Sequence, residues 1–411
     1  MKIDFNVKPY DSTMTVTVQY KKDDVNCNYF YLNRDFVVGN CYVDGTSYDI
    51  ARNMELVRLD DFGYDVNKYK LPDFKSLTLE YTGFLSGKTG CCPYVREVIS
   101  PEFTLIRWET FCYPIFYDEN ISLFEFLTKE NEIDISLEIP EKLIAVGDIF
   151  QKNEPVNGES INNKTKKYFF KSQQNEFAIA ISSFEIKQLS FGKFYLLGEI
   201  DTKTLENTIA KAHDFMNKNF GERDISSKIN YVSIPDKFGS FARETAIFIE
   251  KGTFESVKKM NGIVHEFIHL GWNAQADNTA QKIRFFDEAF TSYFEMRVMD
   301  FLMGENYKLA ELTDRYKKHL EYYDPNIPII DFGSHGYGDL SYTIGAILLH
   351  ELCKFVGVEI FQQATTTFLH KYKDTPVNIE VFCEEYIKLC KKPELNEFFH
   401  DWIYTTNFAI K

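Results

Sequence analysis

Cysteine pairs, long apolar runs and basic residues are all scarce in this sequence, and each shortage excludes a class of protein. None of the eight cysteines belongs to a C-x-x-C pair, and two of them, Cys91 and Cys92, are adjacent. This spacing fits neither a disulfide framework nor a thiolate zinc site, so we expect buried, inert thiols. No window reaches the roughly 18 apolar residues of a membrane-spanning helix.

Positive charge is the clearest deficit. The chain has 46 Lys and Arg against 61 Asp and Glu, a formal charge of -15. Such a surface repels phosphate backbones and anionic lipids, which argues against nucleic-acid and membrane partners. The first eight residues, Met1 to Lys8, lack the unbroken apolar stretch of a signal peptide, so we expect a cytoplasmic protein.

The length and composition, by contrast, are those of a globular protein. The 411 residues are 44% apolar and 26% charged. A single core usually stops growing below this length, so we expect two domains with well-buried cores.

Roughly the first 195 residues carry the alternation of half-buried strands. The clearest run extends from Ile133 to Ile139, where apolar residues alternate with Asp, Ser and Glu before Pro140. Further strands are expected at residues 14–20, 28–32, 36–43, 77–81, 167–171 and 177–181. Many short strands separated by turn residues predict antiparallel sheets packed face to face, in a domain spanning residues 1–198.

After about residue 200 the apolar period changes from two to 3.6, which indicates helices. Helices are expected at residues 203–219, 254–272, 286–302, 342–356, 359–372, 379–390 and 394–403. Asn378 is the predicted N-cap of the sixth. We therefore predict an α+β protein of two domains, with a mainly helical domain at residues 199–411.

Residues 262–272 carry the pattern H-E-x-x-H, at His265, Glu266 and His269. On a helix the two histidines share a face one turn apart, so both imidazoles can bind one ion with Glu266 beside them. Zinc suits neutral imidazole and tolerates an open fourth position. The pattern predicts a catalytic zinc site.

Glu288, near the start of the next expected helix, supplies the third ligand that such a site needs. Two imidazoles and one carboxylate leave zinc able to hold a hydrolytic water. The alternative is an acid that stabilises a helix start through the helix dipole. We predict one Zn²⁺ per chain, bound by His265, His269 and Glu288.

The zinc motif and the segment Asp-Glu-Ala-Phe-Thr-Ser-Tyr at residues 287–293 resemble the aminopeptidase N family of gluzincin zinc metallopeptidases. Residues 342–346, Tyr-Thr-Ile-Gly-Ala, are similar to the family's Tyr-Glu-Lys-Gly-Ala segment, and residues 395–402 to the close of its catalytic domain. Residues 31–33 and 43–45 resemble its N-terminal sheet domain. The resemblance implies a saddle-like β-sandwich domain, then a thermolysin-like domain, without the helical C-terminal domain of larger members.

The motif, its chemistry and the resemblance together predict roles for individual residues. Glu266 would take a proton from the attacking water and pass it to the leaving amine. Tyr342 would donate a hydrogen bond to the developing oxyanion, the alternative being a tyrosine that packs in the core. Thr291 or Ser292, in the turn after Glu288, would orient an imidazole N–H.

In the family, a Gly-Ala-Met-Glu-Asn strand holds the substrate's free amine through its Glu. The corresponding segment here is Phe-Ala-Arg-Glu-Thr at residues 241–245, in which Ala242 and Glu244 match. Glu244 is thus the predicted amine-binding residue. The alternative is a solvent-facing acid paired with Arg243.

The leading hypothesis is a zinc aminopeptidase that hydrolyses the N-terminal residues of short peptides. A zinc endopeptidase, or another small-substrate hydrolase with an open site, follows if Glu244 does not bind an amine. A third hypothesis is a catalytically silent peptidase fold that binds a partner. The catalytically silent fold is disfavoured because the sequence retains His265, Glu266, His269, Glu288 and Tyr342.

Overall fold

The computed structural model describes residues 1–22, 27–59, 64–87, 96–118, 126–127, 129–151, 159–160, 164–223, 225, 229–243, 245–322, 326–335 and 341–410. The chain forms two compact units. The β unit comprises residues 1–200 and 228–252, and the helical unit comprises residues 201–227 and 253–411. The predicted domain boundary, between residues 198 and 199, is two residues from the point where the chain first passes from the β unit to the helical unit. The chain then returns once to the β unit, at residues 228–252.

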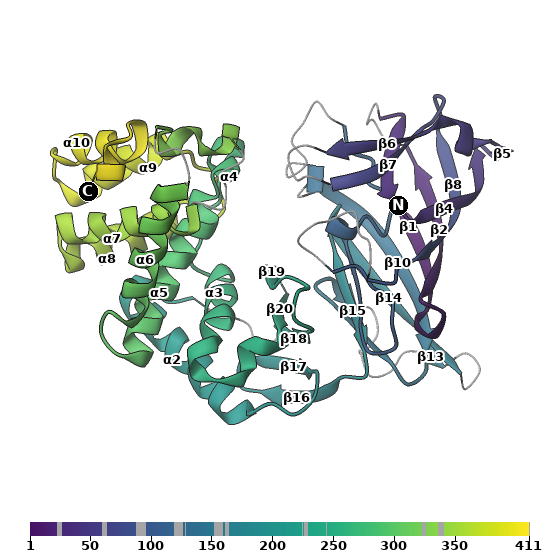
Figure 1. The fold of residues 1–411 in the computed structure, drawn as a ribbon, viewed down its shortest axis with the longest axis horizontal. Coiled ribbons are helices and arrows are strands. Elements are labelled where there is room, and N and C mark those ends of the chain that lie inside the picture. The colour runs from purple at the N-terminus through teal and green to yellow at the C-terminus, as the bar shows by residue number, and fades with distance from the viewer. Residues whose placement is uncertain are drawn as a thin grey trace. The chain divides into compact units, whose positions relative to one another are not determined.

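The described residues of the β unit form twenty strands in four sheets, and many of these strands are labelled in Figure 1. Their bounds are β1 (Lys2–Lys8), β2 (Thr13–Lys21), β3 (Tyr29–Asn33), β4 (Phe36–Val43), β5 (Thr46–Ser47), β6 (Met54–Leu59), β7 (Tyr64–Lys70), β8 (Ser76–Phe84), β9 (Thr104–Arg107), β10 (Glu130–Pro140), β11 (Ile144–Gly147), β12 (Phe150–Gln151), β13 (Glu159–Ser160), β14 (Thr165–Gln174), β15 (Ala178–Ser182), β16 (Glu185–Leu189), β17 (Gly192–Leu196), β18 (Asn230–Ile234), β19 (Phe241–Arg243) and β20 (Ala246–Glu250).

The largest sheet follows the order β12-β14-β10-β1-β2-β8-β4-β5, with β13 beside β14. Neighbours are antiparallel except β1 and β10, which run parallel. Alternate residues of β2 and β8, among them Val16, Val18, Leu79 and Tyr81, are buried. They form one core with the inner residues of the sheets β11-β15-β9 and β3-β7-β6. The segments with period-two alternation thus form packed sheets, as the alternation predicts.

A five-stranded sheet, β16-β17-β18-β20-β19, forms the rest of the β unit. Its three inner strands are parallel, and the outer two are antiparallel to their neighbours. Strand β20 is buried over Ala246 to Ile249 without alternation. A strand covered on both faces has no period-two pattern, so alternation in the sequence does not predict β20.

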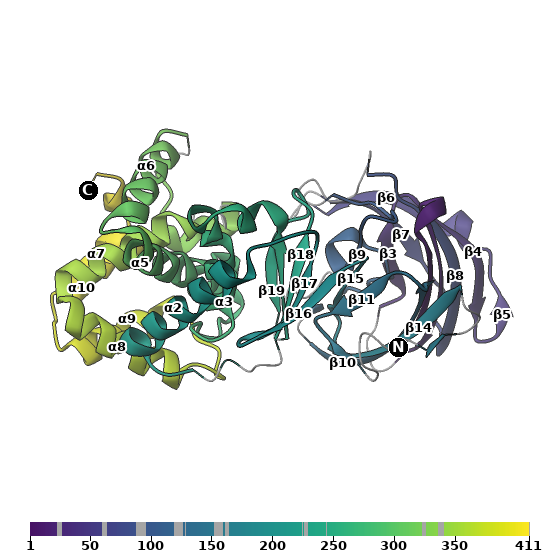
Figure 2. The ribbon, with the colours of Figure 1, turned by 90° about the horizontal axis from the view of Figure 1, so that it is seen from below.

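The helical unit contains the helices α2 to α10, which are labelled in Figure 1 and most of which can also be followed from below in Figure 2. Their bounds are α2 (Thr202–Phe220), α3 (Asn261–His269), α4 (Asn278–Lys282), α5 (Phe290–Met303), α6 (Tyr307–Tyr322), α7 (Ile344–Val356), α8 (Val358–Lys371), α9 (Ile379–Cys390) and α10 (Leu395–Phe399). Two π-helical segments, η6 (Phe285–Ala289) and η9 (His400–Tyr404), adjoin α5 and α10. None of the described helices is both long enough and apolar enough to span a bilayer.

Helix ends follow the capping residues. The Asp201 side chain accepts from the backbone N–H groups of Lys203 and Thr204 at the start of α2. Asn378 caps α9 as predicted, accepting from Val381 N at 2.9 Å. The predicted helix at 254–272 begins only at Asn261, because the residues between buried Phe254 and Met260 are largely exposed and form 3₁₀ turns. These residues offer no apolar stripe that could dock a helix.

The predicted α+β, two-domain fold is confirmed, with sheets first and a helical region after them. The described cysteines are free and buried, as expected. Burial raises the pKa of the Cys112 thiol to about 12 and that of Cys41 to about 11, so both thiols are inert near neutral pH. Cys91, Cys92 and Glu244 lie outside the described residues.

Candidate metal centre

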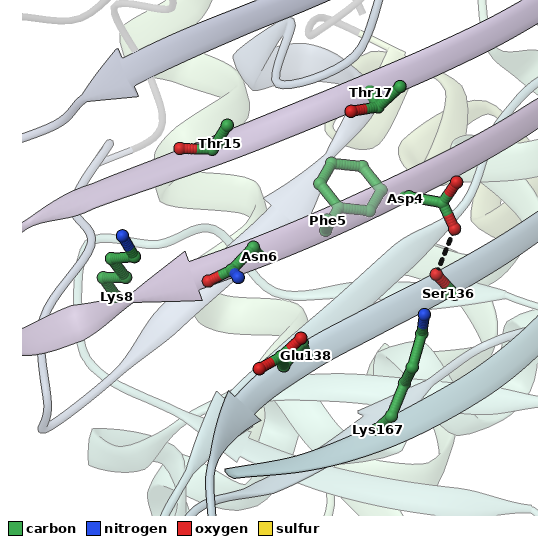
Figure 3. A pocket seen from close by; sticks show the side chains of 9 residues that line it. All are labelled: Asp4, Phe5, Asn6, Lys8, Thr15, Thr17, Ser136, Glu138 and Lys167. Atoms are coloured by element: carbon green, nitrogen blue, oxygen red, sulfur yellow. Dashed lines mark hydrogen bonds between the residues drawn. The ribbon is translucent and has the colours of Figure 1, made fainter. Parts of the chain in front are cut away.

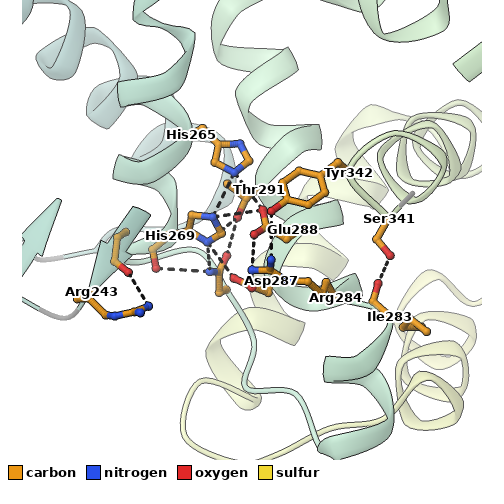
Figure 4. Close-up of polar contacts among 12 residues, drawn as sticks. Arg243, His265, His269, Ile283, Arg284, Asp287, Glu288, Thr291, Ser341 and Tyr342 are labelled. Carbon is orange, nitrogen blue, oxygen red and sulfur yellow. Dashed lines mark hydrogen bonds and ion pairs between the residues drawn. The ribbon is translucent and has the colours of Figure 1, made fainter. Parts of the chain in front are cut away.

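Helix α3 positions the H-E-x-x-H residues in the helical unit. Its Ile263 and Phe267 are fully buried and fix one face of the helix against the core. His265 and His269 share another face one turn apart, with ring centroids 4.9 Å apart (Figure 4). The helix therefore directs both imidazoles to one place.

Glu288 reaches the same place from the π-helical segment η6. The Arg284 carbonyl accepts from the N–H of Glu288 at 2.9 Å and from that of Ala289 at 3.2 Å, which widens the turn. Two phenylalanine rings of η6 pack against Phe382, with centroids 5.2 and 5.8 Å away. Single π turns of this kind occur frequently at functional sites.

Three ligand atoms converge here. His265 Nε2 lies 3.2 Å from His269 Nε2 and 3.1 Å from Glu288 Oε2, and the third side of the triangle is 3.5 Å. A tetrahedral zinc ion with bonds of about 2.0–2.1 Å holds its ligand atoms about 3.3 Å apart. The triangle thus fits three corners of a zinc tetrahedron. It is the single group of three or more potential ligand residues in the described ranges.

The other nitrogen of His265 is fixed by a buried carboxylate. Its Nδ1 lies 3.0 Å from Glu295 Oε2 on α5. Lys308 Nζ and Asn261 Nδ2 hold the second oxygen of Glu295, both at 3.3 Å. A carboxylate accepts, so Nδ1 carries a ring proton, and Nε2 is the nitrogen that offers its lone pair to a metal once it is deprotonated.

His269 is oriented in the same way. Its Nδ1 lies 3.0 Å from Asp287 Oδ1 and 3.2 Å from Thr291 Oγ1, and the Asn273 side-chain amide lies 3.0 Å from it. Thr291 also donates to Asn273 Oδ1 at 3.1 Å. Both histidines therefore present Nε2 to the same point.

The carboxylates around the histidines shift the pKa of both rings. Burial alone would lower them, but hydrogen bonds to Glu288 and Glu295 outweigh burial and raise the pKa of His265 to about 9. Asp287 and Glu288 likewise raise the pKa of His269 well above its usual range. Such a site attracts cations, and a metal that binds here displaces protons.

Glu266 is buried beside this group, with 8% of its surface exposed. Burial raises the pKa of its carboxyl, although the nearby His269 and His265 oppose that rise. It belongs to α3 but not to the three converging ligands. A carboxylate beside a metal and not bound to it can transfer protons.

The start of α7 brings Tyr342 to the site, and a glycine makes this approach possible. A Cβ on Gly345 would lie 2.5 Å from the Ala289 Cβ, so a larger residue would push α7 away from η6. The Ser341 hydroxyl donates to the Ile283 carbonyl and ties the two segments together. Gly345 thus serves to place the tyrosine.

The Tyr342 ring lies parallel to the His265 ring, with centroids 6.0 Å apart. Its hydroxyl hydrogen-bonds to the Glu288 carboxylate and accepts from Arg284 at 3.3 Å (Figure 4). Burial raises the pKa of the phenol well above its usual range, although Arg284 opposes this. The hydroxyl therefore keeps its proton and remains a donor.

Of the residues predicted from the sequence, the structure brings together His265, His269, Glu288 and Tyr342, with Glu266 next to the histidines on α3. Of the two candidates for orienting an imidazole, Thr291 lies against His269. Ser292 is buried but makes no hydrogen bond to either described histidine, because the next helix position points elsewhere.

Glu244 itself is not described, but its neighbour Arg243 is. Arg243 lies 3.1 Å from Glu176 and 3.7 Å from Asp148 in the β unit. The arginine thus has acid partners of its own in the β unit.

Four residues of the site were not predicted, namely Asn273, Arg284, Asp287 and Glu295. Helical spacing offers a signal for three of them. Asn273 follows His269 by four positions, Arg284 precedes Glu288 by four, and Glu295 follows Glu288 by seven. The signal is weak, because many polar residues on the outside of a helix share such spacings with a ligand.

A second hollow lies on the polar face of the large sheet in the β unit (Figure 3). Its volume is about 340 Å³, and Lys8, Lys167, Asp4 and Glu138 supply its charges. Ser136 donates to Asp4 within it. No histidine or cysteine lines it, so it lacks the imidazole ligands of the candidate metal centre.

Comparisons with known proteins place this fold. No protein-family model and no curated protein matches the sequence. A zinc metallopeptidase of the M1 family from Deinococcus radiodurans, solved as a mutant with the substrate Tyr-Ser-Ala, is similar in structure with a TM-score of 0.62. It is 14% identical, and the match covers 98% of this chain and 92% of that one.

Two longer proteins also match over 98% of this chain. Yeast LTA4 hydrolase in complex with bestatin is 15% identical with a TM-score of 0.63, over 67% of its own length. An aminopeptidase N family protein from Idiomarina loihiensis is 11% identical with a TM-score of 0.68, over 76% of its length. The chain therefore has the M1 metallopeptidase fold, which confirms the resemblance predicted from the sequence.

Proposed function

We propose that the protein is a zinc aminopeptidase that acts on short peptides. The observation that carries the proposal is the triangle of His265 Nε2, His269 Nε2 and Glu288 Oε2, whose sides of 3.1–3.5 Å match the edge of a zinc tetrahedron. Two histidines and one carboxylate leave a position open for reaction, which is typical of catalytic and not of structural zinc. Bound zinc would polarise the scissile carbonyl and activate a water for attack at neutral pH.

The chain's own residues supply the proton transfers. Glu266 accepts a proton from the attacking water and delivers it to the leaving amine nitrogen. Tyr342 donates its phenolic proton in a hydrogen bond to the oxygen that gains negative charge. Contacts of Glu295 with His265, and of Asp287 and Thr291 with His269, hold the rings so that little reorganisation is needed during reaction.

The amino-end specificity is supported by two points. Glu244 matches the acid of the family's amine-binding strand, and a carboxylate there pairs with the ammonium of a free N-terminus. The similar Deinococcus protein was solved with the tripeptide Tyr-Ser-Ala. Free peptides of a few residues are accordingly the proposed substrates.

The test compares zinc-loaded protein on aminoacyl amides with free and with N-acetylated amino ends. We expect the free substrate to be cleaved and the acetylated one to lose at least about thirtyfold in kcat/KM, because acetylation removes the charge that Glu244 pairs. Glu244→Ala should lose a similar factor on the free substrate and retain its zinc. Glu199→Ala, an exposed acid of the same unit, is the matched control.

Equal cleavage of both substrates by wild type and Glu244→Ala would contradict the aminopeptidase proposal and favour an endopeptidase or another hydrolase with an open site. Cleavage of neither substrate, with zinc bound, would favour a catalytically silent binding protein.

A further inference from the structure

Arg284 contacts more of the candidate metal centre than any sequence motif suggests. Its guanidinium lies 2.5 Å from Glu288 Oε1 and 2.7 Å from Asp287 Oδ2. It also donates to the Tyr342 hydroxyl at 3.3 Å. One cation therefore contacts the carboxylate ligand, the acid that orients His269, and the phenol (Figure 4).

We propose that Arg284 is a positioning residue that fixes Glu288 as a one-oxygen metal ligand and aligns His269 and Tyr342 with it. The inference rests on the proposed zinc site. It adds a residue that touches neither the peptide nor the metal.

The division of the two Glu288 oxygens is the first support. Oε1 is held by Arg284, whereas Oε2 faces the two histidine Nε2 atoms at 3.1 and 3.5 Å. A carboxylate with both oxygens free can rotate or bind a metal through both. With one oxygen held, Glu288 presents a single oxygen in a fixed orientation.

Charge is the second support. Asp287 and Glu288 are adjacent acids, and the Glu288 side chain is only 5% exposed. Two neighbouring carboxylates repel each other, and a planar guanidinium can pair with both while its other nitrogen bonds the phenol. A lysine ammonium is a point charge and cannot span the three partners at once.

The backbone of Arg284 is the third support. Its φ of 51° and ψ of 36° lie in the left-handed region, which a residue with a Cβ rarely adopts. Its carbonyl accepts the N–H groups of Glu288 and Ala289 and so begins the π turn. Glycine or asparagine would suit this backbone better, yet the position holds the one long side chain that reaches all three partners. Such strain is commonly retained at functional sites.

The test uses Arg284→Met, which keeps length and apolar stem but removes charge and donors, and Arg284→Lys, which keeps the charge. Lys282→Met, an exposed residue two positions away, is the matched control. Zinc affinity is measured by chelator competition, and the visible absorption of the Co²⁺-substituted protein reports coordination number. Four-coordinate Co²⁺ absorbs more strongly than five-coordinate Co²⁺.

We expect Arg284→Met to bind zinc about 10- to 100-fold more weakly and to show the weaker Co²⁺ absorption of a two-oxygen Glu288. Arg284→Lys should fall between it and wild type, and Lys282→Met should equal wild type. A merely structural arginine would lower the melting temperature without changing the Co²⁺ spectrum. If folded Arg284→Met or Arg284→Lys showed the wild-type spectrum and affinity, the inference would be overturned and the zinc site would stand. Failure of wild type itself to bind zinc would overturn both.

Discussion

Each unit of the protein buries a cluster of charged residues, and the two clusters differ in the kinds of side chain that they bring together. In the β unit, Arg107 and Arg243 face Glu109, Asp148 and Glu176. In the helical unit, Arg284 and Lys308 also pair with acids, but two histidines stand among them. The first cluster contains only arginines and acids, and its Arg243 Nε has no hydrogen-bond partner among the described residues. The second leaves two imidazole nitrogens and a carboxylate oxygen directed at one point.

The difference teaches how a buried ionic group can be recognised as a site. Arg107 binds Glu109 through two nitrogens, donates to the Phe238 and Gly239 carbonyls, and lies 4.1 Å from the Phe241 ring. All of its partners belong to the chain. In the helical unit, the outer carboxylates fix the Nδ1 atoms and thereby direct the Nε2 lone pairs toward a cation from outside.

Among the variants that test this difference between the two clusters, Arg243→Met is expected to have the largest effect, a loss of folding stability. Removing the arginine takes the guanidinium charge away from Asp148 and Glu176, which costs about 3–5 kcal/mol. Zinc binding should be unchanged, because all three ligands lie in α3 and η6. Denaturant unfolding measures the loss of stability, and hydrogen exchange shows whether that loss lies in the β unit.

Arg58→Met is the control for Arg243→Met, because Arg58 is an exposed arginine that pairs with Asp65 at the surface and should matter little. A stability equal to wild type for Arg243→Met would show that the β-unit cluster is not a structural one.

Glu266→Gln should have the next largest effect. The amide keeps the size of the side chain but cannot accept the water proton, so turnover should fall at least about a hundredfold. That loss corresponds to roughly 2.7 kcal/mol of barrier. Steady-state kinetics with elemental analysis of the same sample tests it, since zinc should stay at the wild-type level.

The exposed Glu255→Gln, which loses only a surface ion pair, provides the baseline for Glu266→Gln. Retained turnover in Glu266→Gln would exclude the proton-transfer role.

The smallest expected effect is a pH dependence of the β unit. Burial raises the pKa of Asp148 from 3.8 to about 7, although Arg243 opposes this. Between these values the folded state keeps a proton that the unfolded state has released, so stability falls as pH rises toward 7 and levels off above it. The slope should be on the order of 1 kcal/mol per pH unit.

Asp148→Asn should remove this slope, whereas exposed Asp11→Asn should keep it. Unfolding free energies from pH 5 to 8 decide the point, and parallel curves for wild type and Asp148→Asn would contradict it.

The candidate metal ligands could be predicted from the sequence because helical spacing alone puts His265 and His269 on one face. The three-dimensional contacts of the ligands could not. Glu295 and Asp287 contact the histidines across helices. The sequence near them contains other acids, and nothing in it distinguishes the ones that contact a histidine. The π turn at Glu288 is likewise invisible, since it depends on a carbonyl that accepts two N–H groups.

The fold shows the same limit. Strands that alternate, such as those at Val16 and Leu79, were predicted, whereas the fully buried β20 was not, because its four consecutive buried residues resemble a helix segment. Helix α6 was missed for the opposite reason. Its buried apolar residues include Leu312 and Tyr316, but most of its surface is polar, so its periodicity is faint.

The central claim is that His265, His269 and Glu288 hold one zinc ion. The most direct measurement is the zinc content of purified protein after dialysis, for wild type and for His265→Ala, by elemental analysis. We predict close to one equivalent for wild type, and well under a tenth for His265→Ala, because two ligands hold zinc too weakly to survive dialysis. Wild-type protein from zinc-replete cells that carries no zinc, or a His265→Ala variant that carries a full equivalent, would contradict the claim.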